Sequence, residues 1–353
     1  MKTKSSRLSS ASAPDRQMDG ATDLPDGLIY VSDRDPGILR RRAGKGFAYR
    51  GPDGAPLAKK VRDRVVRLGI PPAYTDVWIC AQPHGHLQAT GLDARGRKQY
   101  RYHSKWAIWR AGTKYTHLAA FGAALPALRR RLTRDLQSEA GDMAFSLAAL
   151  VLLLDRAYLR IGNPSYTAQN RTFGATTLLN RHLTLVDGAV QLRFVAKGGK
   201  KVQHTLRDKR LHRIMQNIGD LPGRNLFTYI DEDGAIRTIG SQHVNSYLAK
   251  VSGIAGISAK TFRTWGGSLA AFQAASEAAD KLTVKMMAEA AANRLANTPA
   301  ISRSSYIHPS ILDLAALETD QRLALLDGLA PLDQPGLHQA ERRMLAFLNR
   351  YSR

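Results

Sequence analysis

Short runs of apolar and polar residues alternate in the first third of the chain, a pattern typical of β-strands joined by tight turns. Turn-forming stretches such as Gly51-Pro52-Asp53-Gly54 and Asp93-Ala94-Arg95-Gly96 separate these runs. The pattern predicts one helix over 59–68 and strands over 28–32, 47–50, 76–81, 86–90 and 98–103. This region is therefore predicted to be a small, mostly β domain.

From Trp106 onwards the apolar spacing becomes helical. One β insertion over 182–206 interrupts the helices, with turns at Asp187-Gly188 and Lys197-Gly198-Gly199-Lys200. We predict helices over 114–124, 126–136, 142–159, 241–251, 259–275 and 281–295, and C-terminal packing helices within 312–329 and 337–348. The predicted fold class is α+β: a small β-rich N-terminal domain and a mainly helical domain with a three-stranded sheet insertion.

The domain boundaries follow from composition. Residues 1–24 are rich in Ser, Ala, Asp and Pro without periodicity, which predicts a disordered tail. The β-rich domain is placed at 25–105 and the helical domain at 106–353.

Charge narrows the range of partners. The chain has 52 Lys and Arg against 29 Asp and Glu, a net charge of +23. Such a surface repels itself unless a polyanion covers part of it, so a nucleic acid is the first partner expected. Acidic lipid or ribosomal RNA would balance the same charge. Cys80 is the single cysteine, which excludes an internal disulfide framework.

The longest apolar run, 144–154, is too short to cross a bilayer, so we expect a cytoplasmic protein with no membrane partner.

Several common catalytic motifs are missing from the sequence. It contains no GxxxxGK[ST] phosphate loop, no HExxH, and no tight Asp/Glu cluster suited to two-metal chemistry. We therefore expect no cofactor and no metal site. Phosphodiester cleavage would then depend on side chains that supply cations, a proton donor and a nucleophile.

The candidates for these roles are Arg160, Lys197, Arg263 and Tyr306. Arginine suits a phosphate because its planar fork binds two oxygens and keeps its charge. Each residue alone also has an ordinary structural explanation: Arg160 as a cation at a helix C-terminus, Lys197 as a solvated hairpin lysine. Arg263 could face water, and Tyr306 could lie on a rim. Spacing does not decide between these explanations.

A family resemblance does bear on the choice. Four ordered segments resemble the catalytic blocks of the small poxvirus-like type IB DNA topoisomerases and their bacterial relatives. A further segment, 96–103, is similar to the family's DNA-contacting strand, and the resemblance covers about residues 27–315. The four segments are Leu159-Arg160-Ile161-Gly162-Asn163, Phe194-Val195-Ala196-Lys197, 260–266 and 297–306.

The resemblance implies a mechanism. Tyr306 would attack a DNA phosphodiester, form a 3′-phosphotyrosyl bond and release a 5′-hydroxyl. Arg160 and Arg263 would bind the non-bridging oxygens, and Lys197 would protonate the departing 5′-oxygen. Resealing needs no ATP because one phosphodiester replaces another. The catalytic fold expected is that shared by type IB topoisomerases and tyrosine recombinases.

Asn297 departs from the family pattern, since many members and the tyrosine recombinases have histidine there. An amide can donate a hydrogen bond to a phosphate oxygen but carries neither charge nor a transferable proton. We therefore expect a contact without acid–base work. The structural alternative is that Asn297 caps the helix beginning near Thr298-Pro299.

DNA-contacting residues are expected outside the catalytic set. Strand alternation places Tyr100 and Tyr102 on one face, although they could instead pack beneath the sheet. The arginine triplets 40–42 and 129–131 are interpreted as solvated charge. The full DNA-binding set implied by the resemblance is Gln99, Tyr100, Tyr102, Tyr166 and Lys260.

Two other functions compete with the topoisomerase. A tyrosine recombinase shares the Arg, Lys, Arg, Tyr order, but it usually has histidine where this chain has Lys260, and it lacks the β-rich domain. A non-catalytic basic nucleic-acid binder explains the charge and leaves the ordered blocks unexplained. The favoured expectation is a monomer whose two lobes, joined near 104–112, close around duplex DNA as a C-shaped clamp.

Overall fold

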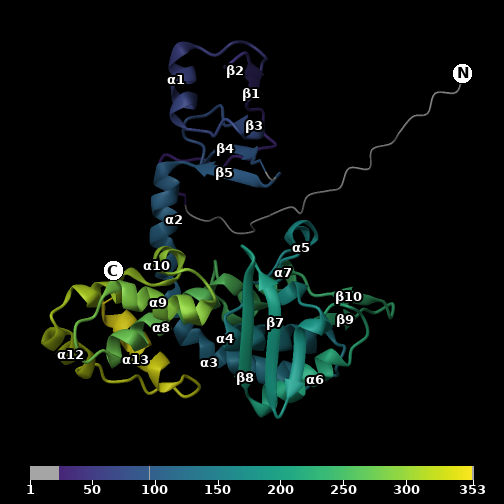
Figure 1. Ribbon diagram of the computed structural model, residues 1–353, viewed down its shortest axis with the longest axis vertical. Helices are drawn as coiled ribbons and strands as arrows, with labels where there is room; N and C mark the ends of the chain where they lie inside the picture. Colours follow the sequence, from purple (N-terminus) through teal and green to yellow (C-terminus); the bar gives the residue numbers. More distant parts are fainter. Residues whose placement is uncertain (1–23, 95, 352–353) are drawn as a thin grey trace, which may run out of the picture. The chain divides into compact units, whose positions relative to one another are not determined.

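The structure is a computed structural model that describes residues 24–94 and 96–351, with side chains described except at 110–114 and 165–166. The tail expected at 1–24 therefore lies almost wholly outside the described residues. The chain divides into two compact units, one ending at Gly112 and the other beginning at Thr113. The sequence analysis placed this division at 105/106. Each unit is described by itself (Figure 1).

The first unit is built on an antiparallel five-stranded sheet in the order β2-β1-β3-β4-β5. Helix α1 (Lys59–Arg67) buries Val65 against this sheet in a small apolar core. The predicted strand over 28–32 is reduced to one bridge between Ile29 and Gly85. The strands are β1 (Ile38–Ala43), β2 (Gly46–Arg50), β3 (Thr75–Ile79), β4 (Leu87–Leu92) and β5 (Lys98–Tyr102).

Strand β1 corrects the interpretation of the triplet 40–42 as simple solvated charge. Arg40 donates hydrogen bonds to the carbonyl oxygens of Ile70, Pro71 and Tyr74, and its guanidinium lies 4.2 Å from the Phe47 ring centroid. The triplet therefore includes a structural arginine that ties β1 to the segment before β3. Consecutive charges hid the strand because they obscure the alternation of apolar and polar positions.

The second unit is mainly helical. A three-stranded antiparallel sheet, β6-β7-β8, confirms the predicted insertion, and a two-stranded sheet pairs β9 with β10. The strands are β6 (Leu183–Val186), β7 (Ala189–Ala196), β8 (Lys200–Arg207), β9 (Thr228–Ile230) and β10 (Ile236–Thr238). The helices are α2 (Ser104–Thr116), which crosses the division, α3 (Leu118–Asp135), α4 (Met143–Ala157), α5 (Pro164–Asn170), α6 (Lys209–Gly219), α7 (Ser241–Ser252), α8 (Ala259–Glu277), α9 (Val284–Leu295), α10 (Pro299–Tyr306), α11 (Pro309–Leu312), α12 (Thr319–Asp327) and α13 (Gln339–Tyr351).

Helix α4 is the central element of this unit. It is buried almost all round, from Phe145 to Leu154, and packs against α3, α6, α7, α8 and β8. Within the unit, Figure 1 shows the three-stranded sheet on one side and helices α8 to α13 on the other. No helix among the described residues is long and apolar enough to cross a membrane.

Helix α3 replaces the two helices predicted at 114–124 and 126–136. It runs continuously through Pro126, and the break falls earlier, at His117. Proline removes one backbone hydrogen bond from a helix interior. Burial of Phe121, Leu125, Leu128 and Leu132 along one face outweighs that cost.

Arg129 corrects the second interpretation of a triplet as solvated charge. Its guanidinium donates to both carboxylate oxygens of Asp155 and to both of Glu341, each at 2.9 Å. Both carboxylates are almost fully buried. Glu341 also accepts from the indole Nε1 of Trp265 at 3.1 Å. A charged cluster thus joins α3, α4 and α13 to α8.

Candidate active site

Arg160 lies in an extended segment beyond α4. The helix ends at Ala157, and Tyr158 adopts left-handed backbone angles with φ of 50°. The carbonyl of Arg160 accepts from the Ala175 amide at 2.8 Å, and that of Ile161 accepts from the Thr176 amide at 2.7 Å. Main-chain hydrogen bonds, not a helix C-terminus, therefore fix Arg160, and the helix-dipole explanation is wrong.

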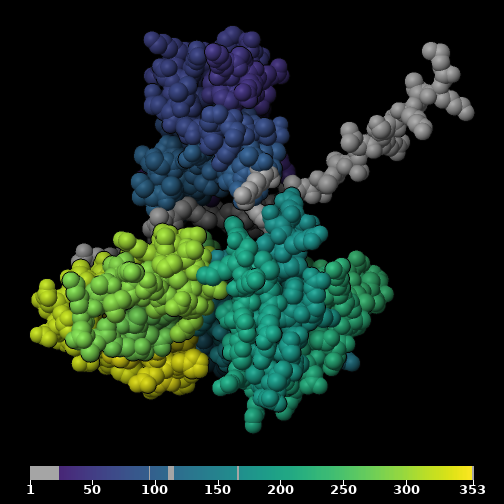
Figure 2. All heavy atoms as spheres, in the orientation of Figure 1, coloured from purple at the N-terminus to yellow at the C-terminus, as the bar shows by residue number. Residues whose placement is uncertain are grey.

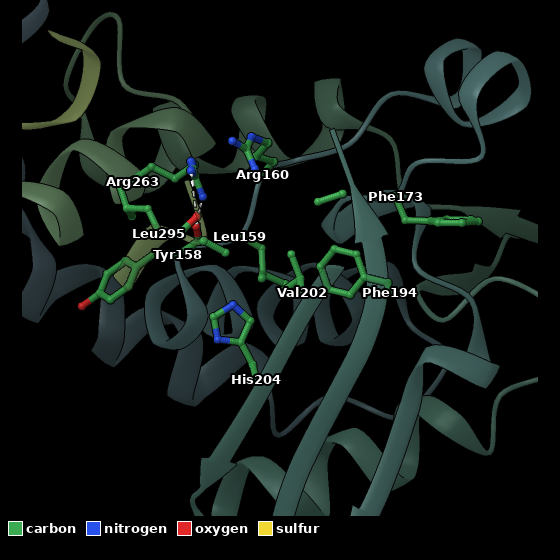
Figure 3. A pocket seen from close by; sticks show the side chains of 11 residues that line it. Tyr158, Leu159, Arg160, Phe173, Phe194, Val202, His204, Arg263 and Leu295 are labelled. Carbon is green, nitrogen blue, oxygen red and sulfur yellow. Dashed lines mark hydrogen bonds between the residues drawn. The ribbon is translucent and has the colours of Figure 1, made fainter. Parts of the chain in front are cut away.

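Arg263 is buried on α8, with 3% of its surface exposed. Its Nη1 donates to the carbonyl of Tyr158 at 2.6 Å and its Nη2 to that of Leu295 at 3.1 Å (Figure 3). Its Nε has no partner in the described part of the chain. Burial lowers the pKa of Arg263, and the nearby Arg160 acts in the same direction. The guanidinium is thus held by neutral oxygens.

Tyr306 is the last residue of α10, and its ring lies under this guanidinium, 4.8 Å from the Arg263 Cζ to the ring centroid. Burial by itself raises the pKa of the phenol. Arg263, followed by Arg160 and Lys260, more than offsets burial, so the pKa of Tyr306 falls below its usual value. A phenol with a lowered pKa is a better nucleophile near neutral pH.

Asn297 lies in the buried junction between α9 and α10. Its Oδ1 accepts a hydrogen bond from the Arg160 Nη2 at 3.1 Å. Its Nδ2 is buried and has no partner among the described residues. Thr298, not Asn297, caps α10 by accepting from the Ile301 amide, so the capping alternative is wrong. The amide NH₂ group is left as a donor beside Arg160.

The β7–β8 hairpin brings lysines to this group. Lys197 is exposed on the turn, which agrees with the predicted hairpin tip. Lys200, which the sequence analysis did not select, donates from Nζ to the backbone carbonyl of Asn297 at 2.6 Å. No local motif separates Lys200 from Lys201 in the sequence. Their difference depends on which face of β8 meets the α9–α10 junction.

A small pocket lies between this hairpin and the two arginines (Figure 3). His204 of β8 lies on its wall, with Phe194 and Val202 beside it. Burial lowers the pKa of His204, and the charge of Arg263 lowers it further. The pocket is therefore lined by an imidazole whose charged form is disfavoured, a feature that sequence reasoning also missed.

The structure thus brings together four of the predicted catalytic residues: Arg160, Arg263, Asn297 and Tyr306. Lys260 is exposed at the start of α8 and contributes to the field at Tyr306. Among the described residues, no three His, Cys, Asp or Glu side chains gather closely enough to hold a metal ion.

The predicted DNA-contacting strand is β5, at the edge of the first unit's sheet. Tyr100 and Tyr102 are 50% and 48% exposed, and their rings are stacked with centroids 6.1 Å apart. They do not pack beneath the sheet. The Gln99 Nε2 donates to the Asp93 carboxylate at 2.9 Å. The side chain of Tyr166, the remaining predicted contact, lies outside the described residues.

Comparison with known proteins assigns the family. Residues 103–305 match the family described as "Eukaryotic DNA topoisomerase I, catalytic core", and residues 46–93 match "Bacterial DNA topoisomerase IB, N-terminal domain". DNA topoisomerase 1B of Acanthamoeba polyphaga mimivirus is 30% identical over 298 residues, which cover 79% of this chain and 87% of that protein. DNA topoisomerase 1B of Vaccinia virus is 23% identical over 254 residues, which cover 69% and 79%. The chain belongs to the type IB DNA topoisomerase family.

Proposed function

We propose that this chain relaxes supercoiled duplex DNA by cutting one strand transiently, with Tyr306 as the nucleophile. The observation that carries the proposal is the position of Arg263, whose buried guanidinium lies 4.8 Å from the Tyr306 ring centroid. The guanidinium cation stabilises the phenolate of Tyr306. It can also bind the phosphate that the phenolate attacks. Family membership supports the activity, and the geometry supports the residues assigned to it.

In the proposed reaction the Tyr306 oxygen forms a bond to phosphorus while the bond from phosphorus to the 5′-oxygen breaks. The phenol proton leaves to solvent, and Lys197 gives a proton to the departing 5′-oxygen. The 3′-phosphotyrosyl bond is an ester of similar energy, so the 5′-hydroxyl can attack it and reseal the strand without ATP. Between the two steps the free end rotates and supercoils are lost.

Hydrogen-bond donors that are already in place in the folded chain would stabilise the negative charge of the transition state. Arg160 and Arg263 supply two guanidinium groups, and the unpartnered Nδ2 of Asn297 supplies a neutral NH. The unpartnered Nε of Arg263 is a further donor. Buried donors without partners are costly, and an oxyanion would satisfy them. This is the catalytic arrangement that we propose is shared with tyrosine recombinases.

We also propose that β5 binds the duplex. The exposed stacked pair Tyr100 and Tyr102 shares one face of a short edge strand with Lys98, whose Nζ lies 5.8 Å from the Tyr100 ring centroid. Aromatic side chains next to cations can contact sugars and bases while the cations meet phosphates. Gln99, Tyr166 and Lys260 are proposed as further contacts, and the enzyme is proposed to act as a monomer.

Plasmid relaxation in EDTA and without ATP tests this function. Wild type should remove supercoils in steps of one linking number and, when denatured with detergent during the reaction, should carry a DNA adduct on the peptide that contains Tyr306. Tyr306→Phe should bind DNA and form no adduct. Supercoils left intact by wild type under chelation, or an adduct mapped to another residue, would contradict the proposal. Site-specific rejoined products would instead indicate the recombinase alternative.

A further inference from the structure

Lys200 forms the shortest connection from the β7–β8 hairpin to the α9–α10 junction that the described hydrogen bonds show. Its Nζ lies 2.6 Å from the carbonyl oxygen of Asn297. The hydrogen bond joins residues 97 positions apart in the sequence. Figure 2 shows the surfaces of the two regions, teal and yellow-green, meeting at this face of the second unit.

The α9–α10 junction, to which Lys200 is hydrogen-bonded, determines where several catalytic groups lie. Helix α9 ends at Leu295, whose carbonyl holds Arg263, and Ala296 then turns the chain with left-handed backbone angles. Asn297 follows, and its side chain is already fixed on one side by Arg160. Hydrogen bonds also fix the main chain of Asn297 on both sides. Its carbonyl oxygen accepts from the Lys200 Nζ at 2.6 Å, and its amide donates to the Ala292 carbonyl oxygen at 2.9 Å.

Strand alternation explains why Lys200 rather than Lys201 reaches the junction. Side chains two residues apart share a face of a strand. Lys200 therefore shares a face with Val202 and His204, which line the pocket beside Arg160 and Arg263. Lys201 lies on the opposite face and is exposed.

We propose that Lys200 is a positioning residue for strand cleavage, which it serves by fixing the main chain at Asn297. The hydrogen bond directs the Asn297 Nδ2 toward the phosphate. This inference rests on the proposed function, because it assigns Asn297 a contact to the phosphate. Lys200 itself transfers no proton.

The test compares single-turnover cleavage of one duplex by the full-length variants Lys200→Met, Lys200→Arg and Lys201→Met. A misplacement of about 1 Å can cost on the order of a hundredfold in rate, so we expect Lys200→Met to cleave ~10- to 100-fold more slowly. Lys200→Arg keeps a donor for the carbonyl and should recover most of the rate. Lys201→Met, the matched control, should cleave like wild type.

A double-mutant cycle separates positioning from a general loss of fold. If Lys200 acts through Asn297, then Lys200→Met should slow cleavage little further in an Asn297→Ala background. The thermal midpoint and the affinity for uncleaved DNA should change little in Lys200→Met. Equal and additive losses in both backgrounds would overturn the inference.

A duplex with sulfur in place of the 5′-bridging oxygen separates positioning from proton donation. A thiolate leaves without a proton because thiols are much more acidic than alcohols. The sulfur should therefore restore cleavage to Lys197→Ala and leave Lys200→Met slow. Restoration of Lys200→Met would make Lys200 a proton donor and overturn the inference. Wild-type rates in Lys200→Met, with Tyr306→Phe inactive, would also overturn it and leave the proposed function standing.

Discussion

Gly267 and Tyr306 lie so close that a β-carbon on Gly267 would sit 2.7 Å from the Tyr306 carbonyl oxygen and 3.0 Å from its Cβ. The neighbouring Ser268 hydroxyl donates to the same carbonyl at 3.3 Å. Glycine inside a helix costs about 1 kcal/mol relative to alanine, so α8 gives up stability at this position. In return the segment carrying the nucleophile rests directly on the helix that carries Arg263.

Gly267→Ala should therefore displace Tyr306 without removing any catalytic group. We expect strand cleavage to slow by ~10- to 100-fold, because the methyl group meets backbone that cannot move freely. Affinity for DNA should stay near that of wild type. Adduct formation under single turnover measures the effect. Gly219→Ala, where the nearest atom would lie 3.6 Å away, is the control; equal rates for both variants and wild type would contradict the argument.

Arg263→Ala should change the pH dependence of cleavage as well as its rate. Loss of one oxyanion donor costs about 10²- to 10³-fold. Arg263 is also the largest influence that lowers the pKa of Tyr306, so without it the phenol loses its proton only at higher pH. The rising limb of the cleavage rate against pH should move upward. A slower enzyme with an unmoved limb would mean that Arg263 acts on the phosphate alone.

Asn297→His should introduce a new titration. The amide of Asn297 does not ionise, whereas imidazole has a reference pKa of about 6.5. Wild type should show no histidine limb from this position, and the variant should gain one in the range of pH 5 to 8. Cleavage rates across that range, compared for the two proteins, measure the difference. Identical profiles would place position 297 outside the contact with phosphate.

Glu341→Gln should destabilise the second unit. Breaking a buried ion pair costs about 3–5 kcal/mol of unfolding free energy. Because Asp155 still pairs with Arg129 in this variant, we expect a loss near the lower value. Urea unfolding measures this cost. Glu289→Gln, which removes only an exposed pair with Lys285, is the control and should change the unfolding free energy by less than about 0.5 kcal/mol.

The same glutamate should also confer a pH dependence on stability. Burial raises the pKa of Glu341, but the hydrogen bonds from Arg129 outweigh it, so the folded-state pKa lies below the usual 4.5. Its contribution is therefore complete above about pH 4.5 and is lost as pH falls through the lower folded value. Below pH 4.5, wild type should lose stability more steeply than Glu341→Gln. Parallel acid limbs would show that the pKa of Glu341 is the same in the folded and the unfolded protein.

Tyr100→Ala and Tyr102→Ala should weaken DNA binding without altering its salt dependence. Interface tyrosines commonly contribute more than about 1 kcal/mol, which corresponds to a loss of roughly fivefold or more in affinity. Because tyrosine is neutral, the slope of log affinity against log salt should stay constant. Lys98→Ala, on the same strand, should reduce that slope by about one. Titrations at several salt concentrations distinguish the two effects.

Local patterns in the sequence predicted much of the second unit. Helices α7, α8 and α9 and the β6–β8 sheet were found within a few residues, because their apolar spacing and glycine turns are local signals. The matched segments also selected four residues that the structure brings together. Their spatial grouping depends on contacts between distant segments, such as Arg160 with Asn297, which spacing alone does not contain.

The errors have physical causes of the same kind. The arginine triplets look alike in sequence, yet Arg129 meets two buried carboxylates and Arg40 meets three backbone carbonyls. The sequence does not distinguish Lys200 from Lys201. Only the folded strand β8 does so, because it places the two side chains on opposite faces and directs Lys200 to Asn297. The end of α4 was placed too late because its apolar run continues into Tyr158 and Leu159, which are buried outside the helix.

The attachment of Arg263 to two peptide carbonyls has a consequence for inhibition. A guanidinium tied to a carboxylate would have to surrender that partner before receiving a phosphodiester, and small oxyanions would compete with it poorly. Here two neutral carbonyl oxygens hold the guanidinium, and no carboxylate among the described residues forms an ion pair with it. Sulfate or inorganic phosphate should therefore enter the same place as the DNA phosphate and slow turnover more than chloride at equal ionic strength.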